Sequence, residues 1–299
     1  MITAILRRAG AGLLVLWAAA TAAYLALLAA PGDTVDAIVG DGADTPGIRA
    51  QIIQEWHLDR SAVVQYLDFL LRAAHGDLGR SYLLQRPVSA VIGSQLAPTL
   101  KLAVAAAVFG VVLALLFAVT ARRLTSTAGL ILVSTPPFLI GIILLSIFSF
   151  RLGWFPVSGD RGFAALVLPA ITLGLPIAGT LAQVLRDGLD RALDEPFAVT
   201  ARARGLRESG VLIRHALKHA LLPAVTMLGW SFGVLIGGTV IVEQVFGRPG
   251  LGQVTVQAVN SSDLPVVLAV VILAAAVFVV INTVTDLAYL LIDPRLRRS

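Results

Sequence analysis

The residues best able to do chemistry lie in one basic segment between two long apolar runs. Arg202, Arg204 and Arg207 lie close together, and His215 and His219 follow at a spacing that places both on one helical face. Two histidines so spaced can bind a metal, but no carboxylate lies beside them and the chain has no cysteine. We therefore expect no catalytic residue, metal or other cofactor in this chain, and a binding role for the arginines.

Hydrolysis of ATP by a phosphate loop is excluded. That loop needs a lysine directly after a glycine, and the only lysines, Lys101 and Lys218, both follow leucine. We expect the chain to receive energy from a separate protein. The net charge of +5 fits basic cytoplasmic loops of a membrane protein better than it fits a nucleic-acid partner.

Composition places the chain in the membrane. It is 57% hydrophobic and 14% charged, whereas soluble domains carry about 25% charged residues. About 20 apolar residues span a hydrocarbon core as a helix. We predict an all-α polytopic membrane protein with six spans at 9–30, 98–120, 128–150, 163–185, 222–245 and 264–291.

Basic residues predict the topology. They gather at the N-terminus, in 121–127, in 186–221 and at the C-terminus, which places both ends in the cytoplasm. The first run is too long for the core of a cleaved signal peptide, so we expect an uncleaved first helix. Glu243 and Asp286 lie near span ends, and we interpret them as carboxylates that reach the membrane surface.

The long segment between the first two spans is an extracytoplasmic insert. We divide the chain into 1–30 (cytoplasmic start and first span), 31–96 (insert) and 97–299 (five-helix core with the loop 186–221). Apolar periodicity predicts two short amphipathic helices in the insert, the second capped by Ser61 and ended by Gly76. The insert either covers helix ends or contacts an extracytoplasmic partner, and the sequence leaves both open.

The segment 186–221 is predicted to be two helices joined at a corner. Pro196 either interrupts the first helix or marks its start, and Gly205 supplies the positive φ that ends it. Ser209 is the expected cap of the second helix, which would lie on the membrane surface, and Pro223 is expected in the first turn of the next span. We interpret the segment as a docking element, with a simple interfacial anchor as the alternative.

Prolines and small residues mark a candidate translocation pathway. Pro136 and Pro137 should kink or break the third span, and Pro169, Gly174 and Pro176 should interrupt the fourth. Such breaks are tolerated where protein or water satisfies the freed carbonyls, although small residues also serve helix packing. The pathway candidates are Pro136, Pro137, Pro176, Ser231 and Gly237.

The basic segment resembles a known motif. The run Thr200-Ala201-Arg202-Ala203-Arg204-Gly205-Leu206, with Leu222-Pro223 downstream, is similar to the cytoplasmic EAA loop of ABC-importer permeases. Four further stretches resemble the dipeptide, oligopeptide and nickel branch, and the large insert resembles its B-type subunit. These stretches are 76–81, 152–156, 242–252 and 293–296. The chain departs from the pattern at Pro196-Phe197, where such permeases carry a tyrosine, and we expect one altered contact with the ATPase.

The resemblance implies a six-helix fold of the ABC type I importer permease kind and an assembly in the bacterial inner (plasma) membrane. It would contain a second homologous permease, two ATP-binding subunits or one fused ATPase, and an extracytoplasmic substrate-binding protein. ATP and Mg would be bound by the ATPase subunits, and the lipid bilayer would surround the permeases. The implied ATPase-coupling residues are Thr200, Ala201, Arg202, Ala203, Arg204, Gly205, Leu206, Arg207, Leu222 and Pro223.

The implied function is ATP-driven import of dipeptides or oligopeptides through a pathway of which this chain forms half. Nickel, haem or another small solute is the alternative substrate. A self-contained secondary transporter and a membrane anchor without transport are the rival classes. Ion-coupled carriers usually hold ionisable residues in mid-membrane, and these are nearly absent here, which disfavours the first rival.

Overall fold

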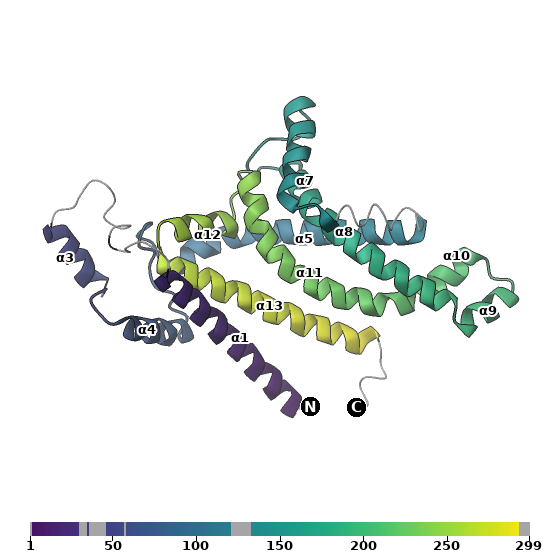
Figure 1. Cartoon of the computed structure of the whole chain (residues 1–299), viewed down its shortest axis with the longest axis horizontal. Coiled ribbons are helices and arrows are strands. Elements are labelled where there is room, and N and C mark those ends of the chain that lie inside the picture. The colour runs from purple at the N-terminus through teal and green to yellow at the C-terminus, as the bar shows by residue number, and fades with distance from the viewer. Residues whose placement is uncertain (1, 30–34, 36–45, 57, 121–132, 293–299) are drawn as a thin grey trace. The chain divides into compact units, whose positions relative to one another are not determined.

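The described part of the chain is helical. The computed structural model describes residues 2–29, 35, 46–56, 58–120 and 133–292, and these contain no β-strand (Figure 1). The described residues of Met1–Ala97 with Gly250–Val279 form one compact unit, and those of Pro98–Pro249 with Val280–Ser299 form another. The all-α prediction is confirmed, and each unit has its own apolar core.

The first unit contains both helices predicted in the insert, as α3 and α4, but only α4 has a distinct apolar face. It also contains a helix, α12, in the segment that connects the predicted spans 222–245 and 264–291. There Leu251, Val254 and Ala258 recur at helical spacing and pack on the core formed by Val88 and Val266. The elements are α1 (Ile2–Ala29), α3 (Pro46–Glu55), α4 (Ala62–Ala74), the start of α5 (Val88–Thr120), α12 (Leu251–Asn260) and most of α13 (Leu264–Ile292).

Helix α4 buries a narrow face. Phe69 is 6% exposed and packs with Tyr24 and Leu268, whereas Val63 and Leu71 remain more than 60% exposed. An exposed apolar face on such a helix fits a position at a membrane surface. The helix ends as expected, with Gly76 at φ +82°, but Ser61 makes no side-chain capping bond.

A buried carboxylate fixes the turn that precedes α5. Asp263 is 2% exposed and accepts hydrogen bonds from the Ser81 hydroxyl (2.5 Å) and the Tyr82 backbone N–H (3.1 Å). A buried charge is stable only when it is hydrogen-bonded in this way. The turn is closed on itself by a bond from the Ser81 N–H to the Arg86 carbonyl (2.9 Å). We call this arrangement the Asp263 clasp.

The second unit is organised around one buried helix, α8. In its most apolar stretch 61% of residues are buried, more than in the other three long apolar helices of the described chain. It packs against α5, α7 and α11. The unit contains α7 (Pro137–Leu144), its continuation as the π-helix η1 (Leu145–Arg151), and α8 (Ala164–Leu193). Helices α9, α10 and α11 follow α8 in the chain.

Glycines let the helices approach α8 closely. A Cβ added at Gly174 would lie 2.8 Å from the Ala106 carbonyl oxygen of α5. One added at Gly188 would lie 2.8 Å from the Cα of Ala220 on α11. Small residues that allow backbone contact are a general means of helix association in membranes.

Prolines do not interrupt α8, contrary to the prediction. Pro169 and Pro176 both lie inside the continuous helix. A proline at 169 leaves the Ala165 carbonyl, four residues earlier, without its helical donor. The guanidinium of Arg248, itself 3% exposed, donates to that carbonyl at 3.2 Å. A side chain far along the sequence thus replaces the missing N–H, which is why α8 continues.

The expected spans appear with different limits. Four helices of the described chain are long and apolar enough to cross a membrane: Val88–Val119, Ala164–Leu193, Pro223–Val245 and Leu264–Thr285. The first and third expected spans appear as the shorter apolar helices Gly10–Ala26 and Pro137–Arg151. The second span begins ten residues earlier than predicted, because α5 continues through Pro98.

Two other expectations concern single positions. The break at Pro136-Pro137 is confirmed, because Pro136 is extended and α7 begins at Pro137. The start of that expected span, 128–132, lies outside the described residues.

Glu243 does not reach the membrane surface, contrary to our interpretation. Its side chain is fully buried and accepts a hydrogen bond from Thr99 at 2.6 Å. The side chain of Asp286 is outside the described set.

The pairing of Arg248 with the carbonyl freed by Pro169 can be tested by a double-mutant cycle. Replacing Arg248 by Met should lower the free energy of unfolding in micelles by about 1–3 kcal/mol, because a buried carbonyl loses its donor. Replacing Pro169 by Ala restores the helical N–H, so the same Arg248→Met change should then cost less. Equal losses in both backgrounds would contradict the assignment.

Candidate functional site

The basic segment forms a corner between the two most closely packed helices of the second unit. Helix α8 ends at Leu193, α9 (Pro196–Ala203) follows, and α10 (Glu208–Val211) leads through a π-helix η2 (Leu212–Ala216) into α11 (Leu217–Val245). In Figure 1, α9 and α10 lie at the end of the α8 and α11 pair. The segment is therefore carried by the rigid core of its unit.

Local sequence explains where α9 begins and ends. Pro196 occupies the first helical turn, where its missing N–H costs nothing, and Glu195 before it is extended. Pro196 therefore marks the start of α9 and does not interrupt a longer helix. At the other end Gly205 has φ +82°, and the Leu206 N–H bonds to the Ala201 carbonyl at 3.2 Å. The predicted role of Gly205 as the corner is confirmed.

The second half of the corner differs from the prediction. Ser209 is not a cap, because Arg207 precedes α10 in extended conformation and no side chain caps the helix. No separate surface helix forms: α10, η2 and α11 run on without a break, and Pro223 lies inside α11. The backbone of Leu222 is helical, and its side chain is outside the described set.

One face of α9 is fixed to the core and the other is open. Ala198 and Ala201 are at most 5% exposed and belong to the core cluster that contains Val211, Ala216 and Ala220. The opposite side is exposed: Val199 is 59% exposed, and Thr200, Ala203, Arg204, Gly205 and Arg207 are all exposed. This open face is the part of the segment available to another protein.

Arg202 acts within the chain. Its Nε donates to Glu208 Oε1 at 2.7 Å, and one terminal nitrogen donates to the Leu193 carbonyl at 3.2 Å. It therefore links the end of α8 to α9 and α10. Arg204 and Arg207 make no ion pair within the described residues, so they are the cations free to meet a partner.

Phe197 stacks on His219. Their ring centroids are 5.0 Å apart with an interplanar angle of 26°, which joins α9 to α11. The ring thus packs inside this chain, and the altered contact with the ATPase stays a prediction. His215 and His219 share a helical face as predicted, and among the described residues no three metal-ligating side chains come together.

The pathway candidates lie at or on three helices of the second unit, α7, α8 and α11. Pro136 and Pro137 start α7, Pro176 is half-buried within α8, and Ser231 is 3% exposed with its hydroxyl bonded to the Met227 carbonyl at 2.7 Å. Gly237 is exposed on α11, with open space where a Cβ would lie.

Sequence reasoning missed three pairings in these arrangements. Glu208 pairs with Arg202 across the Gly205 turn, so no helical spacing connects the two. Arg248 and His219 act on Ala165 and Phe197, which are distant in sequence. The one available signal was Pro169, which implies an orphaned carbonyl somewhere in need of a donor.

Comparison with known proteins identifies the family. Residues 88–298 match the family described as "Binding-protein-dependent transport system inner membrane component". The chain belongs to this family. As a member it is a multi-pass permease subunit of an ABC importer in the bacterial inner membrane.

Curated relatives narrow the branch. The chain is 38% identical over 275 residues to the glutathione transport system permease protein GsiC of Salmonella choleraesuis strain SC-B67, covering 89% of this chain and 90% of that one. It is 36% identical, with the same coverage, to GsiC of Escherichia coli K12. The predicted dipeptide and oligopeptide type of permease is confirmed at this level.

Solved structures support the fold. The inward-facing MetNI methionine ABC transporter matches with a TM-score of 0.54 and 19% identity, covering 68% of this chain and 96% of that chain. An amino acid ABC transporter crystallised with histidines matches with a TM-score of 0.51 and 19% identity, covering 65% and 90%. These matches concern the fold alone.

The role of Arg202 as an internal link can be tested by hydrogen exchange. Arg202→Gln should speed exchange of the α9 amides, because both of its bonds are lost, while overall stability falls by less than about 1 kcal/mol. Arg204→Gln is the matched control and should leave α9 protection unchanged. Equal protection in the two variants would show that Arg202 does not hold the segment.

Proposed function

We propose that this permease forms half of the translocation pathway of an ATP-driven importer of short peptides. The observation that carries the proposal is α9: an exposed basic corner fixed to the core of a chain that has no phosphate loop. A chain of this kind needs an external source of energy. The surface best built to receive it is residues 196–207.

The proposed topology has six spans with both termini in the cytoplasm. Four long apolar helices and two shorter ones in the described chain supply the six candidates. The distribution of basic residues supports the orientation. This topology puts the α9 corner in the cytoplasm and the insert with α3 and α4 outside.

The proposed assembly follows from the family. A second permease completes the pathway, and two ATP-binding subunits, or one fused ATPase, bind ATP and Mg. An extracytoplasmic binding protein supplies the substrate. This chain itself is not proposed to catalyse a reaction.

The coupling step follows from the geometry of the corner. A cleft of the ATPase subunit would receive α9, with Arg204 and Arg207 opposite its carboxylates. Movement of that subunit would then push α9, and the fixed contacts of Ala198, Ala201 and Arg202 would pass the displacement to α8 and α11. Leu222 and Pro223 lie in α11, just beyond the point that receives the push.

Peptides are the substrate class that the relatives favour. The relatives named above are permeases of glutathione transport systems, and glutathione is itself a short peptide. Nickel, haem or another small solute is the alternative, since a binding protein outside this chain would select the substrate. Pro136, Pro137, Pro176, Ser231 and Gly237 stay our candidates for the pathway.

Gly205 offers the sharpest test of coupling. No atom of the described chain lies within 4 Å of a Cβ placed there, so a side chain would meet only the partner. Gly205→Val should abolish peptide uptake and substrate-stimulated ATPase in the reconstituted complex, both by its bulk and by the strain of φ +82°. Gly205→Asn tolerates that φ and separates the two causes.

The two variants have distinct expected outcomes. Gly205→Asn keeps the turn, so it should retain the melting temperature while lowering ATPase coupling through its added volume. Full coupling in Gly205→Val would contradict the docking role. Uptake by the chain without ATPase subunits would instead support a secondary transporter.

A further inference from the structure

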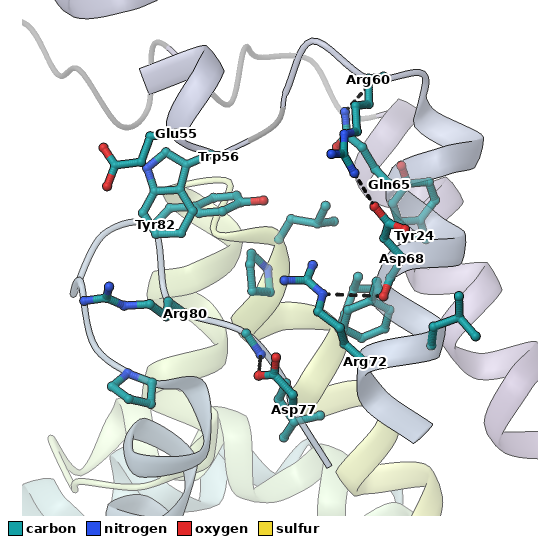
Figure 2. A pocket seen from close by; sticks show the side chains of 18 residues that line it. Tyr24, Glu55, Trp56, Arg60, Gln65, Asp68, Arg72, Asp77, Arg80 and Tyr82 are labelled. Carbon is teal, nitrogen blue, oxygen red and sulfur yellow. Dashed lines mark hydrogen bonds and ion pairs between the residues drawn. The ribbon is translucent and has the colours of Figure 1, made fainter. Parts of the chain in front are cut away.

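The first unit contains a cavity of about 750 Å³ (Figure 2). Its walls come from α1, α3, α4, the turn held by the Asp263 clasp, and the start of α13. Pockets for small ligands usually measure about 300–1,000 Å³ and combine apolar walls with a few placed polar groups. The cavity has the size of a ligand site and lies apart from the basic corner in the sequence.

Most charged groups of the cavity are already used. Arg60 pairs with Asp68 at 2.7 Å, and Asp77 accepts from the Gly79 N–H at 2.9 Å. Arg80 donates to the Gln85 carbonyl at 2.9 Å. These groups form the frame of the cavity, and their capacity for a ligand is reduced.

Two donors remain directed into the space. Arg72 uses its Nε on the Asp68 carbonyl (3.4 Å), and its terminal nitrogens make no hydrogen bond with the described residues. Tyr82 is 9% exposed, and its hydroxyl likewise makes no hydrogen bond within the described chain. Figure 2 shows the Arg72 guanidinium and the Tyr82 hydroxyl pointing into the same part of the cavity.

Tyr82 stays a hydrogen-bond donor at neutral pH. Burial raises the pKa of its phenol to about 12, the negative charge of Asp263 adds to the rise, and Arg72 opposes it. The hydroxyl is therefore protonated wherever the protein functions. With Arg72 it can donate to an anion.

The position of Tyr82 is fixed by the fold. Its N–H bonds to Asp263, and its ring packs edge-on against Trp56 with centroids 4.9 Å apart. Gln85, in the turn, and Ser262, next to Asp263, have φ of +52° and +50°. Such backbone values in residues other than glycine persist only where the surroundings hold them. The donors are thus preorganised.

We propose that this cavity binds the C-terminal carboxylate of a short peptide. Arg72 receives the carboxylate with its terminal nitrogens, Tyr82 donates a third hydrogen bond, and Trp56 with Leu264 contacts the apolar part of the peptide. The choice of a peptide rests on the proposed function, which also places the cavity on the extracytoplasmic side.

The charge of the lining favours a zwitterion over a polyanion. The lining residues include three arginines and three carboxylate residues, so the cavity is close to neutral. The carboxylates of the lining would repel a phosphate. The same carboxylates would attract the ammonium group of a peptide. Glu55 lines the cavity and makes no ion pair within the described residues, and we assign it to that ammonium.

Calorimetry on the full chain in lipid nanodiscs tests the proposal. The probes are the dipeptide Ala-Phe and its C-terminal amide, which differ only at the carboxylate. We expect Ala-Phe to bind, and both the amide and the Arg72→Gln variant to lower affinity by at least about tenfold. Arg72→Lys keeps the positive charge but loses the planar guanidinium that can bind both carboxylate oxygens, so it should give an intermediate affinity. Arg161→Gln, at an exposed arginine outside the cavity, should change nothing.

Several outcomes overturn the proposal. Absence of Ala-Phe binding, equal binding of acid and amide, or unchanged affinity in a folded Arg72→Gln variant each contradicts it. Equal displacement of Ala-Phe by inorganic phosphate does so as well, because it would indicate a general anion site. Uptake by the reconstituted complex is a separate readout: a complex that fails to transport peptides refutes the proposed function, while Arg72-dependent binding still supports the cavity.

Discussion

Close contact between α8 and its neighbours is the constraint on which the second unit depends. At Gly174 and Gly188 the neighbouring backbones approach so closely that a methyl group would not fit. In a bilayer, apolar surface gives little net drive for helices to associate, so such contacts and buried hydrogen bonds must hold the unit together. Two such buried hydrogen bonds are the one from Arg248 to the Ala165 carbonyl of α8 and the one from Thr99 to Glu243.

This packing allows the basic corner to pass a force on to α8 and α11. The contact at Gly188 and Ala220 lies near the end of α8 and the start of α11, beside α9. Arg202 and the Phe197–His219 stack then attach α9 to both helices. A force on the exposed face of α9 therefore reaches two packed helices together. A loop without these attachments would absorb the same displacement by bending.

Sequence reasoning predicted what depends on local pattern. Apolar runs gave the long helices, Gly205 gave the corner, and amphipathic spacing gave α3 and α4. It failed where distant residues decide: α8 continues through Pro169 because Arg248 supplies a donor, and Arg202 is occupied by Glu208. It also missed α12, which lies in the segment between two predicted spans. Predicted pathway residues and partner contacts depend on other subunits, so this chain alone does not determine them.

Cross-linking tests the central claim, that the open face of α9 is seated on an ATPase subunit. Because the chain has no cysteine, Arg204→Cys introduces a single reactive thiol, and Trp154→Cys, at a residue 65% exposed, is the control. A short thiol-reactive photo-cross-linker attached at each position of the assembled complex in membranes would capture neighbouring proteins. The account predicts that position 204 captures an ATP-binding subunit and position 154 does not. Capture from both positions, or from position 154 alone, would contradict it.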